Sequence, residues 1–119
     1  MSTDRTASLS HFAFMPLPNF SMIAFSNAIE VLRMANYLSG QELYRWSVVS
    51  PEGGPVTASN GLTIDTRPVD SIGRPDIVFV CGGIDVQRST EAAHLSTLRR
   101  APRDGLVLGS LCTGPYALA

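Results

Sequence analysis

The chain has 119 residues, of which 45% are hydrophobic and 16% charged, and its formal net charge is −1. This length allows one domain with a hydrophobic core, and the near-neutral charge argues against a strongly basic surface that binds nucleic acid directly. No run approaches the ~18 consecutive apolar residues of a membrane-spanning helix. Residues 1–10 are polar and lack an apolar signal-peptide core, so we expect a disordered leader on a cytoplasmic protein with free cysteines.

The first predicted elements are a strand, a helix and a second strand. Residues 12–15 form a continuous apolar run before a proline, which is typical of a buried strand. Apolar side chains recur at helical spacing through residues 22–38, where Asn19 or Ser21 can cap the N-terminus and a Ser-Gly pair ends the helix. Residues 44–49 alternate and then become apolar, which predicts a strand.

A hairpin and a second buried strand come next. Residues 56–65 are typical of a β-hairpin, because Asn60 and Gly61 readily supply the positive φ angles of a type I′ turn. Residues 77–80 are the clearest buried strand in the chain.

The last predicted elements are a helix over residues 90–100 and a strand over residues 106–108. Apart from the hairpin, strands and helices alternate, which predicts an α/β fold with a parallel sheet covered on both faces. Ligands in such folds bind beyond the carboxyl ends of the strands. Gly82, Gly83 and Cys112 all fall at such ends.

The C-terminal part of the chain has the pattern of a strand, a tight elbow and a helix start. The elbow would present the sulfur of Cys112 to helix amides, which lower a thiol pKa, and Thr113 adds a hydroxyl beside it. Gly82 and Gly83 would let backbone N–H groups approach a bound oxygen. The ordinary alternative is a buried cysteine and a simple turn, and we favour that interpretation strongly for Cys81.

The histidines and the aromatic residues give weaker evidence for a binding site than these glycines and Cys112. His11 and His94 lack metal-ligand spacing, so we predict no metal site and solvated or core histidines. Phe20, Trp46 and Tyr116 are candidates for a cation–π contact with a quaternary ammonium or guanidinium ligand. Trp46 lies in a predicted strand and fits the core better, whereas Phe20 and Tyr116 flank the expected pocket.

Four segments together resemble the N-terminal half of GlxA-type regulators, which are AraC-family transcription factors. They are residues 18–21 (Pro-Asn-Phe-Ser), 28–36 (Ala-Ile-Glu-Val-Leu-Arg-Met-Ala-Asn), 80–83 (Val-Cys-Gly-Gly) and 112–115 (Cys-Thr-Gly-Pro). Their order and spacing carry the resemblance, which runs from about His11 to the last residue. It is nearest to regulators that sense arginine, glycine betaine or carnitine.

The resemblance implies a PfpI-like, class I glutamine amidotransferase-like (flavodoxin-like) fold with a hairpin insertion over residues 11–119, ending after the nucleophile elbow. It implies a homodimer that binds a small-molecule effector without a cofactor, and DNA contact only through a C-terminal helix-turn-helix domain outside these residues. The ligand-binding residues that it implies are Asn19, Phe20, Gly82, Gly83, Ile84, Cys112, Thr113 and Tyr116.

Two departures argue against catalysis. PfpI-type hydrolases carry His directly after the elbow cysteine, where this chain has Thr113. Isonitrile hydratases need an acid on the first helix, where the alignment places Ala24, which cannot transfer a proton. Glu30 lies about 600° of helix rotation further on and is expected to pair with Arg33 instead. We therefore predict a ligand sensor with a vestigial cysteine; the alternatives are a Cys-dependent hydratase or amidase, or an inactive fragment.

Overall fold

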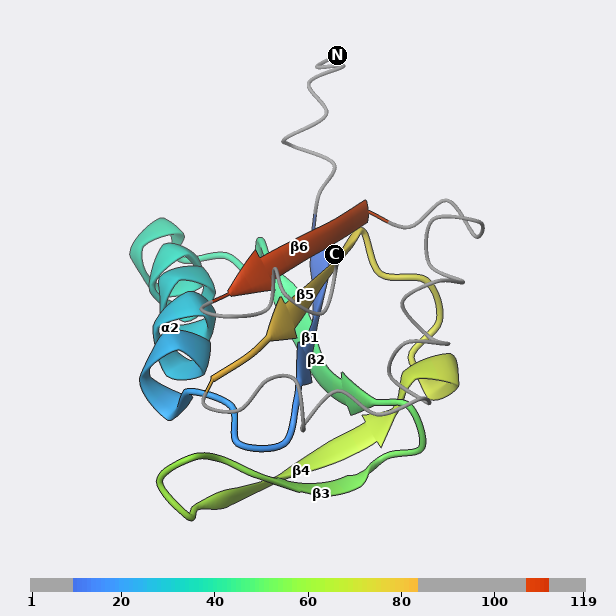
Figure 1. The fold of residues 1–119 in the computed structure, drawn as a ribbon. Coiled ribbons are helices and arrows are strands. Elements are labelled where there is room, and N and C mark those ends of the chain that lie inside the picture. The colour runs from blue at the N-terminus through green and yellow to red at the C-terminus, as the bar shows by residue number, and fades with distance from the viewer. Residues whose placement is uncertain (1–9, 84–106, 112–119) are drawn as a thin grey trace.

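A six-stranded sheet forms the centre of the molecule in the computed structural model, which describes residues 10–83 and 107–111 (Figure 1). The strand order is β3-β4-β2-β1-β5-β6, and every neighbouring pair is parallel except β3 with β4. The elements are β1 (His11–Pro16), α2 (Met22–Ser39), β2 (Arg45–Ser50), β3 (Gly54–Thr57), β4 (Thr63–Pro68), the short 3-10 helix η1 (Val69–Ser71), β5 (Ile77–Cys81) and β6 (Val107–Leu111).

β1 is buried on both faces, which explains its continuous apolar sequence. Phe12 and Phe14 point to the face that α2 covers, where the ring of Phe14 packs edge-on against Phe25 with 6.2 Å between ring centroids. Ala13 and Met15 point to the other face and pack with residues of β2 and β5. Because successive side chains of a strand alternate between faces, a central strand between two cores has to be apolar at every position.

The predicted helix is confirmed, and its ends follow local chemistry. Ser21 is the N-cap, with its hydroxyl accepting a hydrogen bond from the N–H of Ala24 at 3.3 Å. Gly40 ends the helix in the left-handed conformation, and its N–H donates to the carbonyl of Tyr37 at 3.3 Å. α2 then connects the parallel strands β1 and β2 and lies against one face of the sheet (Figure 1).

The predicted hairpin is confirmed, but the predicted turn type is wrong. A type I′ turn needs positive φ at both central residues, whereas Gly61 has φ of 87° and Asn60 does not have a positive φ. The N–H of Gly61 donates to the carbonyl of Ala58 at 3.0 Å, and the N–H of Ala58 donates to the carbonyl of Leu62 at 2.7 Å. The loop is therefore three residues long, and only its last residue needs the left-handed conformation.

Some of the other predicted elements fall on described residues and can be compared with the structure, and others do not. The strands predicted over residues 44–49, 77–80 and 106–108 correspond to β2, β5 and β6, so the α/β fold class is confirmed. The predicted helix over residues 90–100 and residues 1–9 of the predicted leader lie outside the described residues. Within the described part of the chain, no helix is both long and apolar enough to cross a membrane.

Candidate functional site

The carboxyl ends of three neighbouring parallel strands lie level with one another. Pro16 at the end of β1 pairs with Cys81 at the end of β5, and Cys81 pairs with Leu111 at the end of β6. The segments that follow these strands therefore start from one edge of the sheet. This is the edge at which open α/β sheets bind ligands.

The segment between β1 and α2 is held by main-chain hydrogen bonds on two sides. Toward β5, the N–H of Leu17 donates to the carbonyl of Cys81 and the N–H of Ser21 donates to the carbonyl of Gly82, both at 2.9 Å. Toward the hairpin, the N–H of Asn19 donates to the carbonyl of Thr57 at 2.8 Å. Residues 17–21, which we call the β1–α2 turn, thus connect the end of β5 to the hairpin.

Asn19 is the one non-glycine residue with a positive φ among the described residues, at 66°. Asparagine tolerates this left-handed conformation better than most residues, and such strain concentrates at functional sites. Of the two helix caps proposed from the sequence, Ser21 is the one that caps α2, through the hydrogen bond from Ala24. Asn19 instead forms the bend of the β1–α2 turn.

Gly83 lies against the backbone of the β1–α2 turn and forms an antiparallel bridge with Phe20 of that turn. A Cβ atom on Gly83 would lie 2.8 Å from the carbonyl carbon of Phe20 and from the nitrogen of Ser21, and closer still to the carbonyl oxygen of Asn19. The absent side chain is therefore required by packing. The predicted contact of Gly82 and Gly83 with a ligand oxygen stays a prediction.

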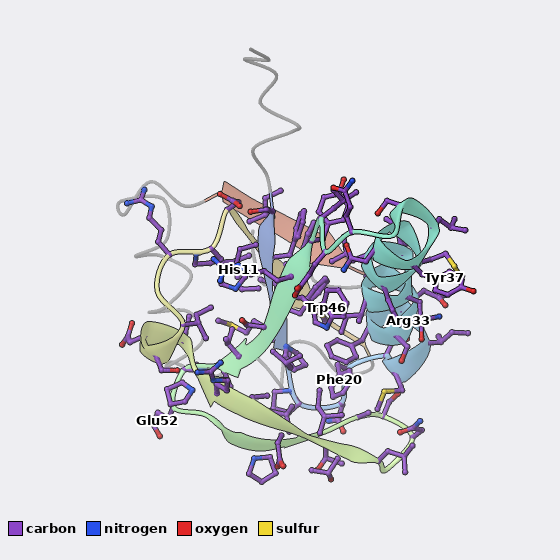
Figure 2. All side chains as sticks on the ribbon, turned by 180° about the vertical axis from the view of Figure 1, so that it is seen from behind. His11, Phe20, Arg33, Tyr37, Trp46 and Glu52 are labelled. Atoms are coloured by element: carbon purple, nitrogen blue, oxygen red, sulfur yellow. The ribbon has the colours of Figure 1, made fainter. Side chains whose placement is uncertain are left out.

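Phe20 points into the core between α2, the sheet and the hairpin (Figure 2). Its side chain is fully buried, and its ring packs edge-on against Phe25 with 5.3 Å between centroids. This packing favours an anchoring role for the ring over the predicted cation–π contact. Trp46 is partly buried in the same cluster, in agreement with its predicted place in the core.

Ala24, which the resemblance aligns with an acid of the isonitrile hydratases, lies in the first turn of α2. Glu30 is exposed and forms an ion pair with Arg33, as predicted. No group of three or more His, Cys, Asp or Glu residues in the described part of the chain could hold a metal ion.

Cys81 is a buried free thiol, as predicted. Burial raises the pKa of Cys81 to about 12, because the low-polarity surroundings disfavour the thiolate. At neutral pH this thiol is protonated, so it is not a nucleophile.

Four of the predicted ligand-binding residues lie outside the described residues, and the structure places none of them. They are Ile84, Cys112, Thr113 and Tyr116. Of the other four, Asn19, Phe20 and Gly83 come together around the β1–α2 turn, and Gly82 joins them through its carbonyl. The sequence analysis predicted the hairpin but missed its contact with this turn: the N–H of Ser59 donates to the carbonyl of Phe20 at 2.9 Å, a contact that no local sequence pattern signals.

A polar cluster at the opposite edge of the sheet was also not expected. One carboxylate oxygen of Asp76 accepts hydrogen bonds from the N–H groups of Ser10 and His11 at 2.8 and 2.9 Å. These two bonds are the main reason that the pKa of Asp76 is lowered. Nε2 of the buried His11 lies 2.9 Å from Oγ of Ser47, and burial is the main reason that the pKa of His11 is lowered.

No protein-family model matches the chain. It is 47% identical over 107 residues to the HTH-type transcriptional regulator GbdR of Pseudomonas aeruginosa, a match that covers 89% of this chain and 29% of GbdR. It is 39% identical over 109 residues to the HTH-type transcriptional regulator CdhR of the same species, covering 91% of this chain and 32% of CdhR. The chain thus spans about a third of the length of the curated relatives that it matches.

Solved structures give the same fold. A crystal structure of an AraC family transcriptional regulator from Pseudomonas putida superposes with a TM-score of 0.78 and 27% identity, over 92% of this chain and 59% of that one. A ThiJ/PfpI family protein from Pseudomonas syringae superposes with a TM-score of 0.66 and 20% identity, over 99% of this chain and 50% of that one. The second match, at this identity, supports the fold alone.

Proposed function

Because the chain is a homologue of HTH-type transcriptional regulators and has the PfpI-like fold, we propose that it is part of the effector-sensing domain of such a regulator. The observation that carries this proposal is the 47% identity to GbdR across 89% of the chain. The effector we propose is a small amino acid or quaternary amine whose breakdown the regulator controls. DNA binding through a separate domain, a homodimer and a cytoplasmic location belong to the same proposal.

The proposed site lies at the carboxyl edge of β1, β5 and β6, with Asn19, Gly82 and Gly83 contributing backbone. The β1–α2 turn supports this role because it contacts both the end of β5 and the hairpin, and α2 begins directly after it. An effector that binds one arrangement of this turn better than another shifts the population toward that arrangement. The start of α2 and the hairpin then move with the turn.

Binding is measured by isothermal titration calorimetry of the protein with arginine, glycine betaine and carnitine. We expect one of the three to bind, and we expect Thr113→Val to weaken that binding about tenfold or more, as for loss of a hydrogen bond to a charged group. The control is Leu62→Ala, directly after the hairpin loop, which shortens an exposed side chain. Absence of binding across all three compounds contradicts the proposal.

We infer further that the site binds its ligand without turnover. The support is Ala24 at the start of α2, which leaves a cysteine at residue 112 without the acid that the related hydratases use. The expected result is no hydrolysis of amides and no hydration of isonitriles. Turnover by the unaltered protein that disappears in Cys112→Ala would establish the enzyme instead.

A further inference from the structure

The loop of the β3–β4 hairpin contains the Asn60-Gly61 pair, which has no part in the proposed effector site. The chain has four asparagines, and Asn60 is the one that glycine follows. Both residues are exposed to solvent. Asparagine is a thermolabile residue, because its side-chain amide reacts with the peptide nitrogen of the next residue where the chain allows the two to meet.

The side chain of Asn60 is folded back along the main chain. Its Oδ1 accepts a hydrogen bond from the N–H of Leu62 at 3.0 Å, which is the arrangement of an Asx turn. The peptide nitrogen of Gly61 lies between these two bonded groups along the chain. The hydrogen bond therefore holds Cγ of Asn60 beside the nitrogen that would attack it.

Gly61 leaves the approach to its nitrogen open. It carries no side chain, and a Cβ atom at this position would meet nothing within 4 Å. The N–H of Gly61 donates to the carbonyl of Ala58 at 3.0 Å, and this bond has to open before the nitrogen can react. Hydrogen bonds of exposed loops open at low free-energy cost, so this bond slows the reaction without preventing it.

We propose that Asn60 is a site of spontaneous deamidation. Base removes the proton from the N–H of Gly61, and the nitrogen attacks Cγ of Asn60. The bond from Cγ to the side-chain nitrogen breaks, and that nitrogen takes up a proton and leaves as ammonia. Water then opens the resulting succinimide ring at one of its two carbonyls. Opening at Cγ gives aspartate with an ordinary main chain, and opening at the main-chain carbonyl gives isoaspartate, in which the chain continues through the side chain.

The isoaspartyl product alters the contact between the hairpin and the β1–α2 turn. It adds a negative charge and one main-chain methylene group to a loop of three residues. Both ends of this loop are held, because the N–H of Ser59 donates to the carbonyl of Phe20 and the carbonyl of Leu62 accepts from the N–H of Ala58. Lengthening the loop shifts these two bonds relative to each other. We therefore expect isoaspartate to weaken the hold of the hairpin on the turn.

The first test follows each asparagine by peptide mapping and mass spectrometry while the protein is incubated in mildly acidic and in mildly alkaline buffer. We expect Asn60 to be converted, several-fold faster in the alkaline buffer. The control within the same chain is Asn27, which is also exposed but lies in α2 before Ala28 and is expected to persist. Conversion of Asn60 that is no faster than that of Asn27, or that does not depend on pH, overturns the proposal.

The second test concerns the ring mechanism. Gly61→Ala places a methyl group beside the attacking nitrogen, and we expect it to slow conversion of Asn60 several-fold. Isoaspartate is measured in the unaltered protein by labelling with an isoaspartyl methyltransferase, because direct hydrolysis of the side-chain amide gives aspartate alone. An unchanged rate in Gly61→Ala, or aspartate without isoaspartate, overturns ring closure onto Gly61.

The third test compares the isoaspartyl form, separated by chromatography, with Asn60→Asp, which has the same charge and an ordinary main chain. We expect the isoaspartyl form to unfold at a lower urea concentration. Equal midpoints overturn the predicted loosening of the hairpin. No effector takes part in these measurements, so an effector panel without binding removes the proposed function and leaves the modification site standing. An Asn60 that persists has the opposite effect.

Discussion

Gly83→Ala tests whether the β1–α2 turn depends on a close approach of two backbone segments. The new Cβ would lie 2.8 Å from two backbone atoms of the turn, so the turn has to move by several tenths of an ångström or more. Forced overpacking of this kind costs ~1–3 kcal/mol. Movement also weakens the bonds from Asn19 to Thr57 and from Ser21 to Gly82, at ~1 kcal/mol each.

We therefore expect Gly83→Ala to lower the free energy of unfolding by about 2–4 kcal/mol, a large part of the 5–15 kcal/mol of an ordinary domain. The measurement is urea unfolding followed by circular dichroism, with the midpoints compared at an unchanged slope. The control is Gly61→Ala, where a Cβ meets nothing within 4 Å and only the positive φ is strained, at about 1 kcal/mol. A Gly83→Ala variant as stable as Gly61→Ala would refute the packing argument.

Three further predictions concern Asn36, the groups at Asp76 and His11, and the thiol of Cys81. Asn36 hydrogen-bonds both the N–H and the carbonyl of one residue after α2, at 2.9 and 2.8 Å, so Asn36→Ala is expected to cost about 1–3 kcal/mol in urea unfolding, and Asn27→Ala, on the exposed side of the helix, much less. The lowered pKa of Asp76 adds stability above its ordinary pKa of about 3.9, and this is lost as pH falls through the lower folded value. The lowered pKa of His11 also makes the protein less stable as pH falls, starting below about pH 6.5, because the unfolded chain then binds the proton more readily than the folded protein does. Asp76→Asn is therefore expected to flatten the loss of stability below pH 4, and an unchanged acid profile would contradict this. Finally, Cys81 with a pKa of about 12 is expected to stay unreactive toward a thiol reagent at pH 8 until the protein unfolds; labelling of native protein at residue 81, located by mass spectrometry, would contradict it.

Part of the candidate site was accessible from the sequence because strand ends and helix starts leave local signals. The run that ends at Cys81, the Gly-Gly that follows and the capped start of α2 all placed these segments at one sheet edge, and the structure has them there. The contacts that these segments make with one another and with the hairpin could not be predicted from the sequence. That Gly83 packs against Asn19, and that Ser59 of the hairpin bonds to Phe20, depends on register between segments far apart in the chain.

The same division holds for the whole fold. The order of apolar residues determined β1, α2, β2 and β5. Burial of one helix face repeats every 3.6 residues, and a strand buried on both faces is a continuous apolar run. The sheet order, the turn type at Gly61, the pairing of His11 with Ser47 and the exposure of Val31 on α2 were decided only by the tertiary structure. The physical reason is that local sequence sets backbone conformation, whereas contacts between distant segments depend on how all of the elements pack at once.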